Sequence, residues 1–350
     1  MRIASTGLLV FSNGFMVSGI QRQLAVIVAL LVGITTTGCR QELAAEFRFR
    51  YAHEQPVGSL RSQSMRFFET ELEKRSQGRI QVELYLGGVL GHERELMDFV
   101  ATGALQSTRG GFFTDANPKF GLLMMPFLVN DWDQAIRLVN SGFVREINRE
   151  AAKNGFHIPA TGISQGFRAH TNNKRPLKHP DDLKGLKMRV PMQEVYVQTA
   201  LAFEENPQEL PYTEVYQALQ TGVVDGQDNA PANIWDFKIH EVSKYLTLTY
   251  YATGPDPFMV NLDWYETLPV ELKEVFDEVA RETMALSDQL NRDKEQEYID
   301  QLSAELETNI VSGDALQPFR QAVQPAYDYF IEKGDFSEED VKRARAASEP

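Results

Sequence analysis

The sequence predicts an α/β fold built as two lobes of similar construction. Short runs of alternating apolar residues are followed by helical patterns, which is typical of strands that pair in parallel through connecting helices. This succession occurs once before and once after about residue 156. A third observation is a helical pattern that begins at Pro269 and is longer than one small lobe is wide.

The predicted elements of the first lobe follow from periodicity and from terminating glycines. Phe47, Phe49 and Tyr51 alternate with polar residues and predict a strand. The helical pattern after it ends at Gly78, a residue that commonly terminates helices. In chain order, we expect a strand at 47–51, a helix at 60–75, a strand at 80–86, a helix at 93–102, a strand at 105–111 and a helix at 132–154.

The second lobe repeats the alternation. We expect extended segments at 158–163 and 167–171, a strand at 187–190, a helix from about 193, and a helix at 213–221 that ends at Gly222. The chain then returns, because Phe258, Val260 and Leu262 alternate as a further strand.

The pattern after Pro269 leaves two interpretations open. Proline is favourable at the start of a helix, and neither glycine nor proline interrupts the pattern as far as Asn309. Roughly 40 residues at about 1.5 Å each would span about 55 Å. Either one helix lies across both lobes, or two helices meet at a break that the sequence does not reveal.

Composition limits the classes of function. The chain has 350 residues, is 43% hydrophobic and 24% charged, and carries a formal net charge of −14. Such a composition is typical of a globular protein, and its length suggests about two domains. The strong negative charge argues against nucleic-acid partners and against adhesion to anionic lipid.

The N-terminus has the features of a targeting segment. The apolar run at 24–34 is shorter than the about 20 residues that span a bilayer, and its length fits the core of a signal peptide. Gly38 and Cys39 follow it and are similar to a bacterial lipoprotein cleavage site. We therefore expect a lipoprotein signal peptide at 1–38 and lipidation of Cys39. A plain signal peptide or an uncleaved anchor is the alternative. Cys39 is the only cysteine, so the chain has no internal disulfide.

Two segments carry side chains suited to binding a carboxylate. Arg189 ends a short predicted strand directly before Pro191, and Asn229 follows a turn at Asp225 and Gly226. An arginine guanidinium presents paired donors that match a carboxylate, and an amide donates and accepts hydrogen bonds at once. In open α/β sheets, ligands bind beyond the ends of strands, where both residues are predicted to lie.

These segments, at 181–191 and 214–229, resemble the solute-binding proteins of tripartite ATP-independent periplasmic (TRAP) transporters, the DctP-like family. The resemblance covers nearly all of the chain after Cys39. It implies a two-lobed periplasmic binding protein with strands that cross the hinge and one long helix that spans both lobes. The first lobe would comprise 44–165 and 255–294, and the second lobe 166–254 and 295–350.

The resemblance also implies a function and site residues. Such a protein captures a small organic acid in the periplasm as its lobes close, and delivers it to a membrane permease of large and small subunits. Arg189 would form a bidentate pair with the ligand carboxylate, Arg168 would help to hold it, and Asn229 would orient it. Tyr212 and Pro191 match positions that wall the pocket. A surface arginine, a salt-bridged strand arginine, a turn residue and a core aromatic are the alternatives for these positions.

Matching positions in the first lobe bear on the identity of the ligand. Glu93 matches an acidic residue that contacts hydroxyl groups in the sialic-acid binder of the family. Gly110 and Gly111 match the end of a strand that lines the cleft, and Gly111 replaces a glutamate of the sialic-acid binder, which makes sialic acid an improbable ligand. His53, between Ala52 and Glu54, ends the first strand and is expected to point toward the same cleft.

Two classes of ligand differ in the side chains that they would need in the first lobe. Arg109 would meet a second carboxylate if its side chain faced the pocket, which would favour a C4-dicarboxylate. Hydroxyl-binding groups at Glu54, Glu93 and Asn229 favour a sugar acid or another hydroxy acid, which we prefer. Each of these first-lobe residues has the alternative of a solvated loop position.

No pattern in the sequence predicts catalysis. His92-Glu93 is not followed by the second histidine of a zinc protease, and the six histidines show no metal-ligand spacing. Nucleophile elbows and glycine-rich phosphate loops are likewise missing from the sequence. We therefore expect a binding protein without cofactor or metal, which meets the membrane only through its N-terminal lipid. The alternative is a sensor module that presents its ligand to a periplasmic receptor.

Overall fold

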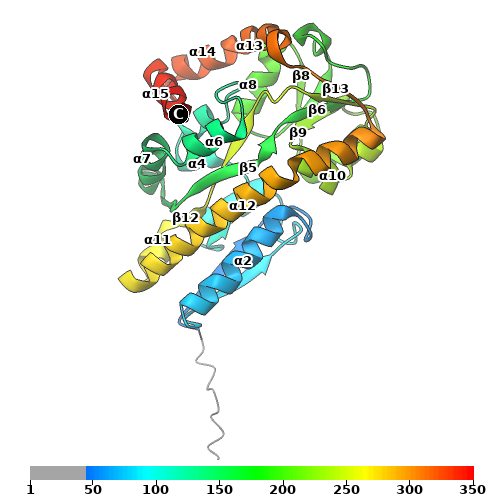
Figure 1. Ribbon diagram of the computed structural model, residues 1–350. Helices are drawn as coiled ribbons and strands as arrows, with labels where there is room; N and C mark the ends of the chain where they lie inside the picture. Colours follow the sequence, from blue (N-terminus) through cyan, green and yellow to red (C-terminus); the bar gives the residue numbers. More distant parts are fainter. Residues whose placement is uncertain (1–44) are drawn as a thin grey trace, which may run out of the picture. The chain divides into compact units, whose positions relative to one another are not determined.

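Two β-sheets with their covering helices form the part of the chain that the structure describes. The structure is a computed structural model of the full chain, and it describes residues 45–350 (Figure 1). The expected signal peptide at 1–38 and the lipidation of Cys39 lie outside the described residues. Within the described part, no helix is long and apolar enough to cross a bilayer.

The first sheet has five strands in the order β2-β1-β3-β12-β4. Its strands are β1 (Phe47–Ala52), β2 (Ile80–Tyr85), β3 (Ser107–Thr108), β4 (Phe156–His157) and β12 (Met259–Asn261). β1 pairs in parallel with β2 and β3, and β12 is antiparallel to β3 and β4. Helix α2 (Leu60–Arg75) packs on this sheet, where Phe68 lies against Phe49 and Phe258 in a buried aromatic cluster. This sheet and its helices are the first lobe.

The second sheet has six strands in the order β13-β10-β6-β9-β7-β8 and forms the second lobe. Its strands are β6 (Ala169–Asn172), β7 (Lys187–Val190), β8 (Asn206–Glu209), β9 (Gly226–Asn229), β10 (Tyr245–Leu248) and β13 (Glu307–Ile310). β7 is parallel to β9, and β6 is antiparallel to β9 with Ala169 opposite Asn229. The carboxyl ends of β7 and β9 and the start of β6 therefore meet at one edge of the sheet. This register brings Arg168, Arg189 and Asn229 together.

Two strands cross between the sheets, as expected. β5 (Thr161–Phe167) leads from β4 in the first sheet to β6 in the second, and β11 (Thr253–Pro257) leads from β10 back to β12. The two crossing strands pair with each other in an antiparallel two-stranded ribbon. Gln165 and Gly166 in β5 have positive φ values of 62° and 99°. A positive φ is uncommon for a residue with a side chain, so Gln165 marks a strained position in the crossing strand.

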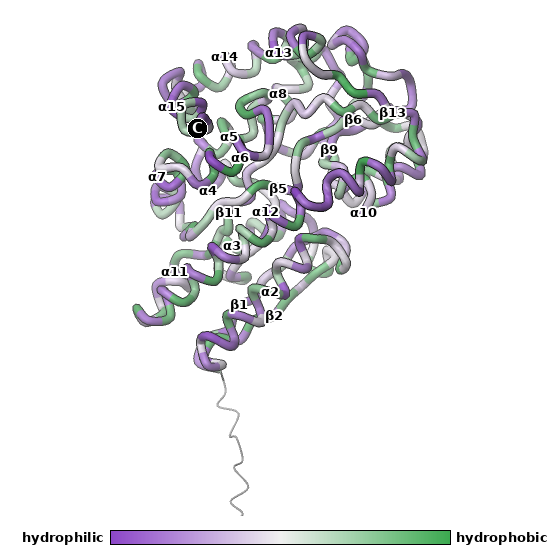
Figure 2. The backbone as a smooth tube through the Cα atoms, in the orientation of Figure 1, coloured by the Kyte–Doolittle hydropathy of each residue, from purple (hydrophilic) through white to green (hydrophobic). Residues whose placement is uncertain are grey.

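A single helix, α12 (Val270–Glu305), confirms the first of the two alternatives that the sequence left open. It runs for 36 residues without a break, beside α2 and past α10 (Pro231–Asp236) (Figure 1). Hydrophobic and hydrophilic residues alternate along it (Figure 2). Leu272 and Phe276 belong to the aromatic core of the first lobe, whereas Ile299 and Leu302 pack in the core of the second. One helix thus stabilises both lobes.

The same helix binds the crossing strand β5 through two carboxylates. Asp288 accepts a hydrogen bond from the backbone N–H of Ile163 at 2.6 Å, and Glu295 accepts one from Phe167 at 3.3 Å. Burial raises the pKa of Asp288 to about 8. Because Gly162 and Gly166 carry no side chain, the helix can approach this strand closely.

We expect Gly162→Ala to destabilise the protein by about 1–3 kcal/mol, the usual cost of overpacking a well-filled contact. A Cβ at Gly162 would lie 2.7 Å from Asp288 Oδ1 and 2.8 Å from Met284 Cε. Urea unfolding of the two proteins gives the difference. Gly142→Ala is the matched control, because a Cβ there meets nothing nearer than Arg145 Nη2 at 3.8 Å. Equal stability of the two variants would contradict this packing argument.

Three predicted elements of the first lobe differ from those observed. The helix expected at 132–154 is divided into α6 (Trp132–Val139), α7 (Gly142–Glu150) and a 3₁₀ turn, η1 (Ala151–Asn154), because the Ser141 side chain caps a new helix by accepting from Val144 N–H. The strand expected at 105–111 is reduced to Ser107–Thr108, since Gly110 and Gly111 have positive φ. Leu262 starts α11 (Leu262–Glu266) instead of ending a strand, because Asn261 caps that helix.

The remaining helices are short. They are α3 (Glu93–Ala101), α4 (Phe113–Ala116), α5 (Phe120–Leu123), α8 (Glu194–Ala202), α9 (Val215–Gln220), α13 (Gln317–Ala322), α14 (Gln324–Lys333) and α15 (Glu338–Ser348), with 3₁₀ turns η2 (Pro180–Asp182), η3 (Tyr212–Glu214), η4 (Ile239–Val242) and η5 (Gly313–Leu316). The C-terminal helices differ from the expected division of the chain. Phe330 in α14 and Val341 in α15 join the cluster of Trp132 and Val144. Helix α14 packs on α8, whereas α15, in the segment expected wholly in the second lobe, packs on α6 and α7.

Candidate ligand-binding site

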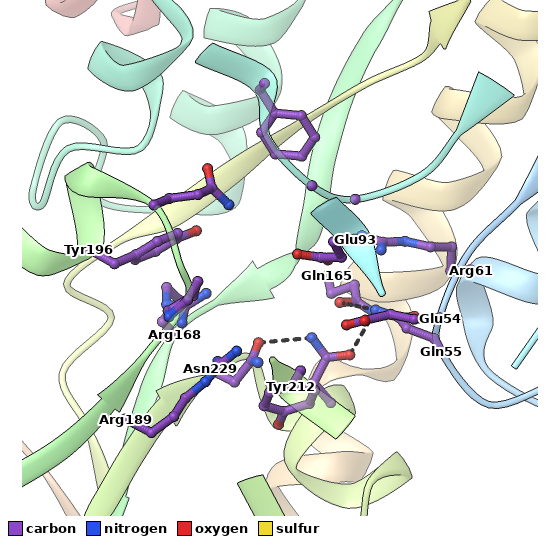
Figure 3. Close-up of a pocket in the computed structure, with 16 residues that line it drawn as sticks. Glu54, Gln55, Arg61, Glu93, Gln165, Arg168, Arg189, Tyr196, Tyr212 and Asn229 are labelled. Atoms are coloured by element: carbon purple, nitrogen blue, oxygen red, sulfur yellow. Dashed lines mark hydrogen bonds between the residues drawn. The ribbon is translucent and has the colours of Figure 1, made fainter. Parts of the chain in front are cut away.

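A cavity lies between the two lobes at the edge of the second sheet where β6, β7 and β9 meet (Figure 3). Both lobes and the crossing strand β5 contribute to its wall. The lining residues are Glu54, Gln55, Arg61, Glu93, Gly110, Gly111, Phe113, Gln165, Arg168, Arg189, Pro191, Gln193, Tyr196, Tyr212, Asn229 and Asn233. Most of these side chains are polar or charged, so the cavity is suited to a small hydrophilic molecule.

Arg189 is the cation in this wall whose charge has no close counterpart. It is 3% exposed, and its Nε donates to the Leu210 carbonyl oxygen at 2.8 Å. Its guanidinium lies 5.0 Å from the centre of the Tyr212 ring, a cation–π contact. Among the described residues, Arg189 takes part in no ion pair. Burial lowers the pKa of Arg189 from its ordinary value, and an arginine remains charged in proteins.

Arg168 reaches the same cavity but is already paired. It precedes β6, and its side chain forms an ion pair with Asp228 and donates to the Asp228 carbonyl oxygen at 2.7 Å. Its guanidinium also lies 4.5 Å from the centre of the Tyr196 ring. Burial acts to lower the pKa of Arg168, but Asp228 outweighs it and the pKa lies well above its ordinary value. Arg168 can therefore add donors to a ligand, but Asp228 neutralises most of its charge.

Asn229 has a fixed amide orientation. Its Oδ1 accepts from the backbone N–H of Ala230 at 2.9 Å and from Asn233 Nδ2 at 2.8 Å. Both acceptor positions of this oxygen are then used. Whereas the sequence allowed this amide to donate and accept, in the structure only its NH₂ group is left for a ligand.

The opposite wall carries acceptor groups. Glu54 and Glu93 of the first lobe both line the cavity, and Oε2 of Glu54 has no hydrogen-bond partner among the described residues. On the second-lobe side, the same holds for Oε1 of Gln193, the residue directly before α8. Burial, followed by the charge of Glu93, raises the pKa of Glu54 to about 8, and burial also raises the pKa of Glu93. Buried polar atoms without a partner are costly, and a carboxyl group keeps an acceptor oxygen whether or not it is protonated, so these groups are ready for donors from a ligand.

Gly110 allows the acidic wall to form. Its φ is 83°, and a Cβ there would lie 2.7 Å from Arg61 Nη1 and 2.8 Å from Glu93 Oε1. Gly111 has a φ of 114°, and a Cβ would lie 3.6 Å from the Glu93 backbone oxygen. The two glycines bend the chain at the end of β3 and leave the space in which Arg61 approaches Glu93.

Comparisons with known proteins identify the family of the chain. Residues 51–333 match the family described as bacterial extracellular solute-binding protein, family 7, named DctP. The match covers well over half of the chain. The chain belongs to this family.

Relatives of this DctP-family protein include solved structures with nearly complete coverage. A TRAP periplasmic solute-binding protein of Haemophilus influenzae with bound L-gulonate is 26% identical, covers 86% of this chain and 99% of its own, and superposes with a TM-score of 0.82. A counterpart from Polaromonas sp. JS666, bound to D-erythronate, is 27% identical, covers 86% and 98%, and has a TM-score of 0.80. The 2,3-diketo-L-gulonate-binding periplasmic protein YiaO of Escherichia coli is 27% identical over 79% of this chain and 83% of its own.

The family consists of solute receptors of transporters and not of enzymes. The fold of this DctP-family protein is the expected two-lobed α/β fold with crossing strands and a long helix. In the part of the chain that the structure describes, no group of three or more metal-binding side chains gathers in one place.

Two residues expected at the cleft of the DctP-family protein lie elsewhere. His53 is buried behind the cavity wall, where its Nδ1 accepts from Gln55 N–H at 3.1 Å and its Nε2 lies 2.9 Å from Ser62 Oγ. Arg109 is fully buried and pairs with Asp256 in the crossing strand β11, so its side chain does not face the pocket. The condition under which Arg109 would meet a second carboxylate is therefore not fulfilled.

The other expected residues line the cavity: Arg189, Arg168, Asn229, Tyr212, Glu93, Pro191, Gly110 and Gly111. Sequence reasoning missed further lining residues, namely Gln55, Arg61, Phe113, Gln165, Gln193, Tyr196 and Asn233. One signal was present for Asn233, because Pro231 predicts a helix start and places Asn233 in the first turn after Asn229. For the others, only tertiary structure brings them to the cavity.

Proposed function

We propose that this protein captures a small organic acid with hydroxyl groups, a sugar acid or related hydroxy acid, and delivers it to a TRAP permease. The observation that carries the proposal is Arg189. A buried guanidinium that faces a cavity, without an ion pair among the described residues, lacks the counter-charge that burial normally requires. A ligand carboxylate supplies that charge and can take the paired donors of the guanidinium.

The two walls of the cavity favour opposite ends of such a ligand. The second lobe offers donors from Arg189, Arg168 and the NH₂ group of Asn229. The first lobe offers acceptors at Glu54 and Glu93, and Gln193, before α8 of the second lobe, adds one more. A carboxylate only accepts hydrogen bonds, whereas a hydroxyl group can donate one. A hydroxy acid whose carboxylate lies at Arg189 satisfies both walls.

A C4-dicarboxylate is the weaker candidate. Its second carboxylate would need a cation on the first-lobe side, and Arg109, the residue proposed for that role, is paired with Asp256 away from the cavity. The relatives with L-gulonate and D-erythronate bound, at 26% and 27% identity, support a hydroxy acid for this chain.

Closure of the lobes around the acid would complete the contacts that hold it and would distinguish the loaded protein from the empty one for the permease. A ligand shifts the equilibrium toward the closed form to the extent that it binds that form better. Exclusion of water strengthens the attraction between Arg189 and a carboxylate, although desolvation of both groups offsets part of this gain. The net charge of −14 does not prevent binding of an anion, because screening at physiological salt acts over about 8 Å. The permease subunits, and a membrane tether through lipid on Cys39, remain part of the proposal.

A thermal-shift screen of organic acids tests the proposed ligand class. We expect L-gulonate or D-erythronate to raise the melting temperature in a concentration-dependent way, because a ligand that binds only the folded state stabilises it by mass action. Calorimetry would give the dissociation constants, with succinate as the dicarboxylate comparison. Stabilisation by succinate and by no hydroxy acid would contradict the proposed class, and a flat response to every acid would contradict the proposed function.

A further inference from the structure

Four amide side chains form a continuous chain of hydrogen bonds beside the cavity. Asn233 Nδ2 donates to Asn229 Oδ1 at 2.8 Å, and Gln55 Nε2 donates to Asn233 Oδ1 at 3.1 Å. Gln55 and Gln165 then exchange two bonds, at 2.8 and 2.7 Å. All four residues are buried, and Figure 3 shows this chain of amides crossing the cavity wall. We call Asn229, Asn233, Gln55 and Gln165 the amide relay.

A backbone group fixes the direction of every bond in the amide relay. The N–H of Ala230 donates to Asn229 Oδ1, and a backbone N–H can only donate. The atom that it meets must therefore be the oxygen of Asn229, so Asn233 must offer its NH₂ group there. The oxygen of Asn233 then faces Gln55, which must donate in turn. The amide relay thus turns the NH₂ group of Asn229 away from Asn233, toward the cavity wall where it also meets the Tyr212 hydroxyl group.

The amide relay also joins the moving parts of the protein. Gln55 follows β1 in the first lobe, whereas Asn233 lies in α10, next to Ile234 in the core of the second lobe. Gln165 lies in the crossing strand β5, at the position with a φ of 62°. The hydrogen bond between Gln55 and Asn233 spans the two lobes, so we expect it to break when they separate.

We propose that Asn233 is a positioning residue for ligand capture: it occupies the second acceptor position of Asn229 Oδ1, so that Asn229 presents only donors to the ligand carboxylate, and Gln55 completes this arrangement as the lobes close. The inference rests on the proposed function in taking the ligand to be an acid. A carboxylate has no donor, so a reversed Asn229 amide would place oxygen against oxygen. The orientation of one amide therefore decides between attraction and repulsion at the carboxylate.

Variants of Asn233 test the orientation of Asn229. Asn233→Asp places an oxygen atom against Asn229 Oδ1, so the Asn229 amide must either move away or turn around and leave the Ala230 N–H without an acceptor. Asn233→Ala removes the donor without adding charge and separates the two effects. Calorimetric titration of the full chain with D-erythronate and with L-gulonate measures the affinities. We expect Asn233→Asp to bind each acid at least tenfold more weakly than wild type, and Asn233→Ala to show a smaller loss of affinity. The melting temperature of each variant without acid shows whether its fold is intact.

Variants of Gln55 test the link to closure. Gln55→Glu cannot donate to Asn233, and Gln55→Ala is the uncharged comparison. Because the bond forms only between closed lobes, both variants should dissociate the acid several-fold faster in stopped-flow experiments while associating at the wild-type rate. If Gln55 merely stabilised one lobe, its variants would change the melting temperature and leave the ratio of the dissociation rate to the association rate unaltered.

The outcomes separate this inference from the proposed function. If wild-type protein binds either acid and Asn233→Asp binds it within twofold of wild type, the amide relay has no positioning role. If wild-type protein binds neither acid, the proposed function fails. In that case, the distance between two spin labels tests the amide relay. The labels are attached at Val89→Cys and Val223→Cys, both at exposed positions, in a Cys39→Ser background. A longer lobe separation in Gln55→Glu than in the parent supports the amide relay, and equal separations overturn it.

Discussion

Arg189→Ala is expected to lower the affinity for hydroxy acids at least 100-fold, while the protein stays folded. Arg189 lines the cavity, and its bond to the Leu210 carbonyl oxygen uses Nε, so its two Nη groups can bind a ligand. Loss of a charge-assisted bidentate contact removes about 3 kcal/mol or more, and every 1.4 kcal/mol is about a factor of ten in affinity. Calorimetry with D-erythronate and L-gulonate measures the effect.

The variant Arg189→Lys shows whether charge alone is sufficient. Lysine keeps the positive charge but cannot present the planar fork, so its affinity should also fall well below that of the wild type. Arg48→Ala is the matched control, because the Arg48 side chain is 71% exposed and pairs with Glu83 on the edge of the first sheet. This control should bind with wild-type affinity. Near-native binding by Arg189→Ala would refute the assigned role.

Asp256→Asn is expected to produce the largest loss of stability, about 3–5 kcal/mol, which is typical when one partner of a buried ion pair is removed. Asp256 lies in the crossing strand β11, where it pairs with Arg109 and lies 3.6 Å from Arg61. The side chains of Arg109 and Asp256 are 0% and 1% exposed. Asparagine keeps the shape but leaves Arg109 charged and buried. Urea unfolding at neutral pH gives the difference in free energy.

The pH dependence of stability and a surface pair provide the controls for Asp256→Asn. Burial acts to raise the pKa of Asp256, but Arg109 and Arg61 outweigh it and the pKa lies below its ordinary value. Its contribution is therefore complete above the unfolded-state pKa of about 3.9 and is lost as the pH falls through the lower folded-state value. Glu83→Gln, which breaks the exposed pair with Arg48, should cost less than about 1 kcal/mol. A similar cost for both variants would contradict the importance of burial.

The arginines show how far sequence alone could lead. Arg189, Arg168 and Arg109 are chemically identical, and the sequence placed each near the end of a strand. What distinguishes them is their neighbours in space: Asp228 neutralises Arg168, Asp256 neutralises Arg109, and Arg189 has no such partner in the described part of the chain. Those carboxylates lie 60 and 147 residues away from their arginines, so no local pattern reveals them.

Periodicity predicted elements well where a single pattern dominated. The strand at Lys187–Val190 and the helix at Leu60–Arg75 were predicted with their observed bounds. The helix at 132–154 was predicted as continuous because its apolar spacing hardly changes, yet one hydrogen bond from Ser141 was sufficient to start a new helix. The amide relay was beyond prediction, since its four members come from the end of β1, from β5 and from two neighbouring elements of the second lobe.

The helix α12 has a consequence for the engineering of this protein. Its first half completes one hydrophobic core, its second half completes the other, and its carboxylates bind the backbone of β5 in between. A chimera that exchanged one lobe for that of a relative would have to join α12 to a foreign core, and both hydrophobic cores would then lack matching side chains from this helix. New specificity is therefore better built by replacing side chains around the cavity than by transplanting a lobe as a cassette.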